Sequence, residues 1–173
     1  MKNKSITSKY IILGIIALGI FICLITTHKY ATKKQIYNTT YYTITIPYNW
    51  NLKSLNGDYL NKLSLNQENI ISIEVFQDCK YNNSITSIIT NIYGVHSYIK
   101  DEVYTKKINN YTLTKVNIGF EQSASEEYKK SPAEPIQLHY FYVKNNILID
   151  FFVISNSVEE HIIDEIAESL ILN

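Results

Sequence analysis

The most reactive side chain in this sequence is the thiol of Cys79, which stands among charged residues. A cysteine acts as a nucleophile when a base and a positive environment stabilise its thiolate. Lys80 adds one positive charge, and Glu74 and Asp78 stand shortly before the thiol, but no histidine has a spacing typical of Cys–His catalysis. We favour a passive thiol beside solvated carboxylates over a reactive or metal-binding cluster of these residues with a histidine.

Three histidines fall in the carboxy-terminal three quarters of the chain: His96, His139 and His161. His96 and His161 lie in segments with helical periodicity, and His139 lies in a predicted strand. A protein metal site needs three or four converging ligands. No second histidine follows at the helical spacing that would supply one, so the sequence predicts no catalytic residue, no metal site and no cofactor.

Asp150 is the one acidic residue inside an otherwise apolar strand, with Leu148 and Phe152 on the same face. Such an acid either faces solvent or is buried for a specific reason. Antiparallel sheets often expose one face to water, and we therefore expect Asp150 to be solvated.

The elements that must position these residues follow from hydrophobic periodicity. Residues 41–46, 59–65 and 70–76 alternate as half-buried strands, and the first of them ends at Pro47. We expect Trp50, just beyond it, to anchor the edge of the core. From residue 84 to residue 99 the apolar period changes to that of a helix, which Gly94 weakens.

The second half of the domain predicts two hairpins and a closing helix. Strands 103–108 and 111–120 are linked by Asn109-Asn110, and strands 136–143 and 147–154 by Asn145-Asn146. Asparagine tolerates the positive φ that tight hairpin turns need. The last helix carries one apolar stripe, and Ser157 with Glu160 forms its expected capping box. The stripe consists of Ile162, Ile163, Ile166, Leu170 and Ile171.

This order predicts an α+β domain, an antiparallel sheet flanked by two helices. It resembles the Mog1/PsbP-like fold, an α/β/α sandwich. The likeness rests on the first strand running into Pro47 and Trp50, on the strand ISIEVF before a helix, and on the final hairpin followed by a helix. The resemblance implies a non-catalytic binding or assembly module, often membrane-anchored in bacteria, and it carries over no functional residue.

An uncharged apolar run precedes the domain. It is about as long as the shortest helix that crosses a bilayer, and it follows Lys2, Lys4 and Lys9. We expect a cytoplasmic tail at 1–9 and a transmembrane helix at 10–27. The lysines on its two sides nearly balance, but a short basic tail ahead of a first span favours a cytoplasmic amino terminus.

Cleavage or lipidation of the run is disfavoured. No pair of small residues follows it for signal peptidase, and Ile22 is too large to precede a lipidated Cys23. We expect an uncleaved anchor, a juxtamembrane linker at 28–37, and an extracytoplasmic domain at 38–173 at the cell membrane.

Charge is segregated along the chain. Every Asp and Glu lies after residue 57, whereas six of the 16 lysines lie in the first 34 residues. The acidic domain repels phosphate backbones, which excludes nucleic acid as the expected partner. The chain has no arginine, so bidentate phosphate clamps are unavailable. The abundance of Asn, Ile, Lys and Tyr indicates an A+T-rich coding sequence, as in low-G+C Gram-positive bacteria.

Residues 121–135 form the one long polar connection. Connections of this length are uncommon unless they are functional or disordered. They are the best candidate contact for a protein or envelope partner, centred on Glu126, Glu127, Tyr128, Lys129 and Lys130, and a plain surface loop is the favoured alternative. A receptor for a small ligand or cell-wall glycan that uses exposed tyrosines is the alternative function, and an enzyme is less favoured.

Overall fold

The computed structural model describes residues 15–20, 33–78, 84–94, 96–120 and 136–173. The chain divides into two compact units, residues 1–35 with 47–49, and residues 36–46 with 50–173. Residues 15–20 are helical, and the rest of the predicted span 10–27 lies outside the described residues, as does the tail 1–9. No helix among the described residues is long and apolar enough to cross a membrane.

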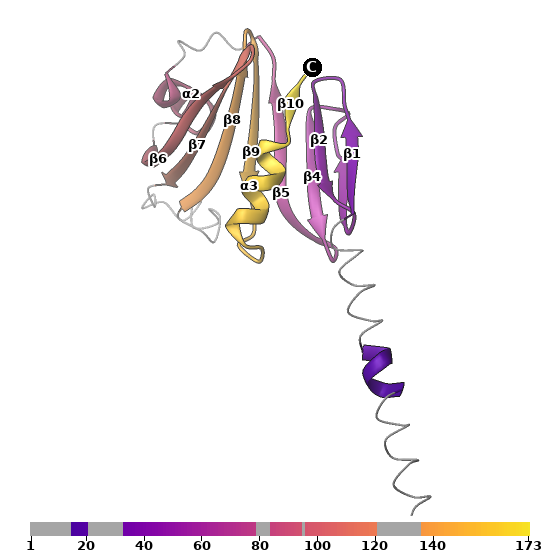
Figure 1. Ribbon diagram of the computed structural model, residues 1–173. Helices are drawn as coiled ribbons and strands as arrows, with labels where there is room; N and C mark the ends of the chain where they lie inside the picture. Colours follow the sequence, from indigo (N-terminus) through magenta and orange to yellow (C-terminus); the bar gives the residue numbers. More distant parts are fainter. Residues whose placement is uncertain (1–14, 21–32, 79–83, 95, 121–135) are drawn as a thin grey trace, which may run out of the picture. The chain divides into compact units, whose positions relative to one another are not determined.

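The larger unit is built on a seven-stranded sheet in which every neighbouring pair is antiparallel (Figure 1). Its strands in spatial order are β3 (Trp50–Ser54), β4 (Leu60–Leu65), β5 (Glu68–Phe76), β9 (Ile147–Val153), β8 (Ile136–Lys144), β7 (Tyr111–Phe120) and β6 (Ser97–Ile108). The predicted antiparallel sheet is confirmed, and β3 is an additional strand that begins at Trp50, a buried residue as expected.

Both predicted Asn-Asn hairpins are present. Asn109 and Asn145 adopt positive φ angles of 49° and 52°, which connect β6 to β7 and β8 to β9. Asn66 and Gln67 make a similar turn between β4 and β5. Apart from glycine, asparagine is the residue that adopts positive φ at the lowest energetic cost.

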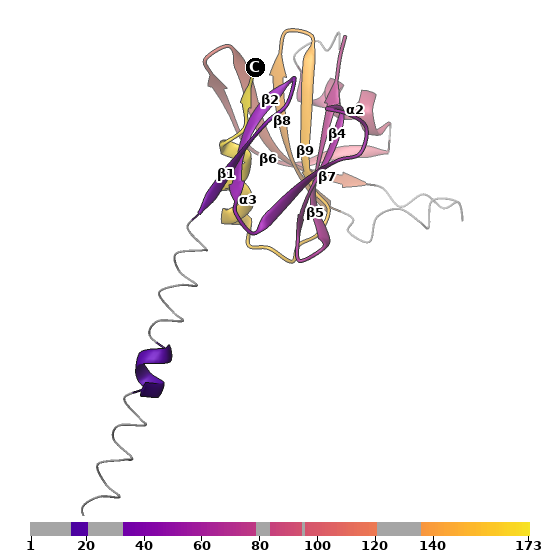
Figure 2. The same ribbon diagram turned by 90° about the vertical axis from the view of Figure 1, so that its right-hand side faces the viewer.

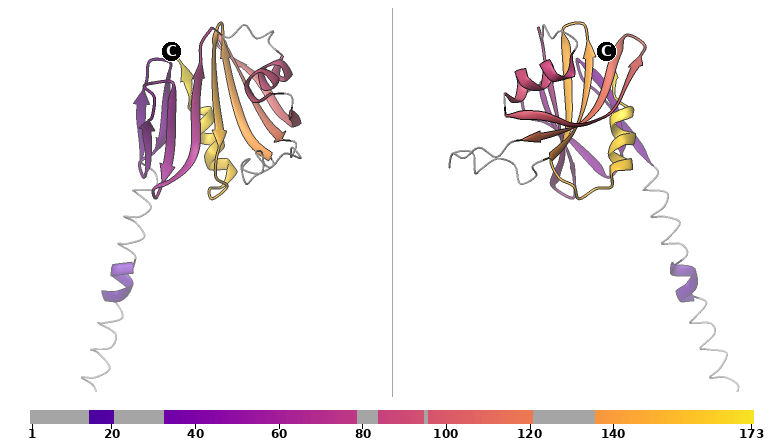
Figure 3. Two further views of the ribbon diagram at one scale, coloured as in Figure 1. Left: turned by 180° about the vertical axis from the view of Figure 1, so that it is seen from behind. Right: turned by 90° about the vertical axis from the view of Figure 1, so that its left-hand side faces the viewer.

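Helices α2 (Ile85–Tyr93) and α3 (Glu160–Glu168) cover opposite faces of the sheet, as the right-hand view of Figure 3 shows. Ile88 and Ile89 of α2 pack on Val116, Ile118, Phe141 and Leu148. The inner side of α3 packs on the other face, in the larger core. That core includes Tyr42, Ile44, Ile46, Ile71, Ile73, Tyr140, Tyr142, Ile149, Phe151, Ile163, Ile166 and Ala167.

The first helix is shorter than the periodicity predicted. It ends at Tyr93 because Gly94 adopts a φ of 81°, which a helix cannot continue. Ser97 then begins β6 and donates its hydroxyl to the Gly94 carbonyl. Gly94, expected to end the helix early or to kink it, therefore ends it, and Ile99 packs from a strand although it continues the helical period.

A smaller sheet has the order β1 (Lys34–Asn38), β2 (Tyr42–Pro47) and β10 (Ile171–Leu172), seen beside the main sheet in Figure 2. β2 alternates as predicted, and β1 begins inside the segment 28–37 expected to be a linker. Ile171 is exposed on β10 and does not belong to the helical stripe.

The chain leaves α3 early because Ser169 links the end of the helix to β2. Its hydroxyl accepts the Thr45 amide at 3.0 Å and lies 2.7 Å from the Ile166 carbonyl. The expected capping box at the other end is wrong. Glu159 is the N-cap residue without a side-chain cap bond, and the Ser157 hydroxyl bonds Ser155.

Candidate functional site

Asp150 is fully buried, so the expectation that it faces solvent is wrong. Its Oδ1 lies 2.9 Å from Nδ1 of His139, and its Oδ2 accepts the hydroxyl of Tyr93. Tyr93 is the last residue of α2, Asp150 lies on β9, and His139 lies on the neighbouring strand β8. Helix α2 covers the face that a bare antiparallel sheet would expose, and this cover is the reason for the burial.

The His139 ring is enclosed by aromatic side chains. It stacks on Phe141 and Phe152 at centroid distances of 5.6 and 5.2 Å, and the ring of Tyr93 meets it edge-on at 5.2 Å. Nε2 of His139 is buried and has no hydrogen-bond partner among the described residues. Burial raises the pKa of Tyr93 far above its usual value, and the charge of Asp150 adds to the effect.

A His–Asp pair catalyses when the distal histidine nitrogen reaches a nucleophile or substrate. Here Nε2 of His139 is buried, and the imidazole ring is stacked between Phe141 and Phe152. The geometry instead fastens α2 to the sheet, because Tyr93 and His139 both bond the same carboxylate.

The other candidates for chemistry fall at several places in the chain. Glu74 is the cross-strand partner of Asp150, and its pKa is raised by burial and then by the charge of Asp150. His96 lies in the turn before β6, and the exposed His161 pairs with Glu159 at 3.1 Å. Cys79 and Lys80 lie outside the described residues. Within the described part of the chain, no group of three or more His, Cys, Asp or Glu side chains could hold a metal ion.

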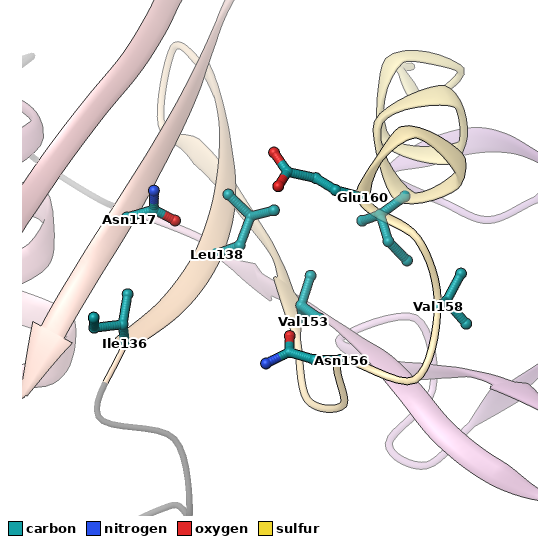
Figure 4. A pocket seen from close by; sticks show the side chains of 8 residues that line it. Asn117, Ile136, Leu138, Val153, Asn156, Val158 and Glu160 are labelled. Carbon is teal, nitrogen blue, oxygen red and sulfur yellow. The ribbon is translucent and has the colours of Figure 1, made fainter.

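A cavity of about 260 Å³ opens on the opposite face of the sheet, where the chain enters α3. Figure 4 shows the Glu160 carboxylate reaching from the start of α3 across this cavity toward β8 and β7. Five of the lining residues are apolar and three are polar or charged. The lining residues are Asn117, Ile136, Leu138, Val153, Asn156, Val158, Glu160 and Ile163.

A buried lysine lies beside the cavity. Lys115, on β7 two residues before Asn117, is only 5% exposed, and its Nζ lies 2.6 Å from both Glu160 Oε1 and Asp164 Oδ1. Tyr140 donates its hydroxyl to the same Asp164 oxygen at 2.6 Å. Burial lowers the pKa of Lys115, but the hydrogen bonds and charges of Asp164 and Glu160 outweigh it, so the pKa is raised overall.

The cluster of Lys115, Glu160 and Asp164 beside the cavity carries a surplus of negative charge, because two carboxylates share the single ammonium of Lys115. No lysine occurs after residue 144, and sheet lysines pair with acids of α3: Lys115 with Glu160 and Asp164, and Lys106 with Glu168. The acids at and along α3 are Glu159, Glu160, Asp164, Glu165 and Glu168. We call the cavity together with these acids the α3 site.

The sequence did not single out the α3 site. Lys115 lies in an alternating strand, where a lysine is usually taken as solvent-facing. Two features of the sequence could have indicated the site. One is a lysine on the core-facing side of strand β7, and the other is an amphipathic helix that is rich in acidic residues.

The predicted partner loop cannot be placed beside this site. Glu126, Glu127, Tyr128, Lys129 and Lys130 all lie outside the described residues, in the segment that precedes Ile136 of β8.

The exposed tyrosines among the described residues of the larger unit do not gather on one face. Tyr59 packs on Tyr41 with ring centroids 5.3 Å apart, and Gln77 bonds both hydroxyls. Tyr98 lies on β6, at the other end of the strand order from the Tyr59 turn before β4. Trp50 is buried and contributes nothing to a surface platform.

Comparison with known proteins identifies the fold. No protein-family description matches the sequence. No curated protein matches it either. The solution structure of the cyanobacterial PsbP protein CyanoP, from Synechocystis sp. PCC 6803, is similar to this chain with a TM-score of 0.50 and 11% identity over 81% of this chain and 92% of that one.

A crystal structure from Bacteroides thetaiotaomicron VPI-5482 also matches, with a TM-score of 0.46 and 13% identity. The match covers 83% of this chain and 49% of that one. The likeness to CyanoP shows that this chain has the PsbP/Mog1-like fold that the sequence predicts.

Proposed function

We propose that this protein is a non-catalytic binding or assembly module, tethered to the cell membrane by its apolar segment 10–27, with the folded domain outside. The observation that carries the proposal is the structural difference between the two faces of the PsbP-like sheet. The face with a His–Asp pair is closed by α2, whereas the accessible α3 site is lined by apolar side chains together with two asparagines and the Glu160 carboxylate.

That arrangement suits recognition better than reaction. An enzyme needs an accessible nucleophile or base near donors that stabilise the transition state. The buried His139 offers neither access nor a neighbouring nucleophile among the described residues. The α3 site combines a small apolar surface with a polar rim, which is typical of protein-binding patches.

The tether supports the proposal because it would keep the domain close to partners at the membrane. A single-span anchor confines the domain to a thin layer at the membrane surface and so raises its effective concentration for neighbouring partners. Weak contacts are then sufficient for assembly.

The side of the membrane is tested with a carboxy-terminal tag. Protease added to intact protoplasts should digest the tag as rapidly as it does after lysis. Protection until lysis would place the domain in the cytoplasm and overturn the extracytoplasmic part of the proposal.

Binding is tested by isolating the full-length chain from membranes under mild detergent. The control carries residues 1–35 fused to an unrelated domain. We expect a discrete companion protein at fixed stoichiometry with the full chain and not with the control. Identical isolates from both would contradict a binding function for the domain.

A glycan receptor is the second candidate, and the paired rings of Tyr41 and Tyr59 are the observation in its favour. Aromatic rings stack on sugars. If glycan binding is the function, Tyr59→Ala should abolish retention on purified cell walls, whereas Tyr98→Ala should not.

A further inference from the structure

The most informative unused feature of the fold is the unbalanced charge at the α3 site. We propose that the cavity of the α3 site receives a basic side chain, lysine or arginine, from a protein partner. This inference rests on the proposed binding function and names the chemistry of the partner.

The shape of the cavity fits a long amphipathic side chain. Ile136, Leu138 and Val153 form apolar walls on the sheet, and Val158 and Ile163 close the helix side. Lysine and arginine bury their methylene stems on apolar surface while the charged head remains at a polar rim.

The rim supplies acceptors for the charged head. The Glu160 side chain is 65% exposed although its Oε1 already bonds Lys115, so its second oxygen is available to a cation from solvent. Asn117 and Asn156 also line the cavity, and a side-chain amide oxygen is a hydrogen-bond acceptor. A cation bound there would restore charge balance to the Lys115, Glu160 and Asp164 cluster.

The surrounding charge favours a protein segment over other cations and surfaces. Glu160 and Asp164 share the single ammonium of Lys115, so a basic segment that reaches the cavity meets a net negative charge. The same field repels anionic lipid head groups and nucleic acid. A single free amine would use only one of these acids.

The experiment uses the full chain in nanodiscs of zwitterionic phosphatidylcholine, with isotope-labelled Ile, Leu and Val methyl groups. The probe is the peptide Gly-Leu-Lys-Gly-Lys-Leu-Gly, and the matched probe has both lysines acetylated. We expect the lysine peptide to shift the methyl signals of Ile136, Leu138 and Val153, and the acetylated peptide to leave them in place.

Two charge variants on the same helix locate the effect. Glu160→Gln should lower the affinity for the lysine peptide about tenfold, which is the change expected when one partly desolvated charge contact is lost. Glu168→Gln removes the same charge near the other end of α3, where Glu168 pairs with Lys106, and should change the affinity by less than about twofold because it is an exposed pair. Unchanged methyl dispersion in both variants shows that they are folded.

Three results would overturn the inference. The acetylated peptide could bind as well as the lysine peptide, Glu160→Gln could match Glu168→Gln, or magnesium ions alone could produce the same methyl shifts. A fourth concerns the chain itself: if Lys129→Ala with Lys130→Ala moves the same methyl signals and strengthens peptide binding, the occupant is an internal lysine.

Failure here is distinguishable from failure of the proposed function. A companion protein that co-isolates equally with wild type and with Glu160→Gln keeps the binding function and removes the basic side chain from it. Absence of any companion removes both.

Discussion

At the scale of single residues, Asp150 determines how the sheet face under α2 is organised. A fully buried carboxylate is tolerated because it accepts from both His139 and Tyr93. Its two oxygens are thus matched by donors from a strand and from a helix.

Asp150→Asn should therefore be strongly destabilising, since the amide places donors against donors and removes the charge that His139 and Tyr93 bond. We expect a loss of about 2–4 kcal/mol in the free energy of unfolding, measured with urea. Asp101→Asn on the exposed part of β6 is the matched control and should change stability by less than about 0.5 kcal/mol. Equal effects would contradict a buried network.

Gly119 is a second position at which a single added atom, a Cβ, would disturb the packing. It pairs with Tyr98 across β7 and β6, and a Cβ at residue 119 would overlap the Tyr98 ring. Because Tyr98 is 47% exposed, its ring can swing toward solvent. Gly119→Ala should cost about 1 kcal/mol of stability in wild type and much less in a Tyr98→Ala background. The same cost in both backgrounds would show that the ring does not limit the site.

At the scale of elements, the junction between α3 and β10 depends on Ser169. Its hydroxyl holds the Thr45 amide at 3.0 Å and the Thr45 carbonyl at 2.9 Å, so it joins the helix end to β2. The turn directs the last residues onto β2 as β10.

Ser169→Ala should leave the Thr45 amide without its partner and cost about 1 kcal/mol. Hydrogen exchange at Thr45 should accelerate accordingly. Ser157→Ala is the control, because Ser157 does not cap α3 in the structure. A larger effect at Ser157 than at Ser169 would mean that the predicted capping box forms after all.

Elements with a long regular period were predictable, and short or interrupted ones were not. The two Asn-Asn hairpins and strand β2 follow from local alternation and turn chemistry. β10 has only two residues, and β3 has no clear alternation, so no local signal marks them. The apolar period of the first helix continues past Gly94 into a strand, so Gly94 is the only local sign of where the helix ends.

At the scale of the whole molecule, two helices on opposite faces explain the errors at the candidate sites. Whether Asp150 or Lys115 is buried depends on which sheet face α2 and α3 cover, which no local pattern reveals. The general fold was predictable because the order of elements is preserved. The α3 site was not, because its residues come from β7, β8, β9 and α3.

The same burial predicts how stability depends on alkaline pH. The pKa of Tyr140 is raised by burial and then by Asp164, burial raises that of Tyr142, and the pKa of Lys115 is raised overall. Groups with a raised folded pKa stabilise the protein below their unfolded pKa, which is about 10 for tyrosine and lysine. That stabilisation is lost as the pH rises further.

The urea midpoint should therefore be level between about pH 8 and 9.5 and fall steeply above about pH 10. The ultraviolet signal of the buried tyrosinates should appear together with unfolding. A smooth tyrosine titration near pH 10 in a protein that remains folded would contradict this burial.

The most direct test of the central claim is photo-cross-linking in intact cells from the full-length chain. A photoreactive residue replaces Asn156 on the rim of the α3 site, or Asn145 in the turn at the opposite end of β9. We predict one discrete cross-linked protein from position 156 and none from position 145. Equal patterns from both positions, or no product from position 156, would contradict a binding module that works through the α3 site.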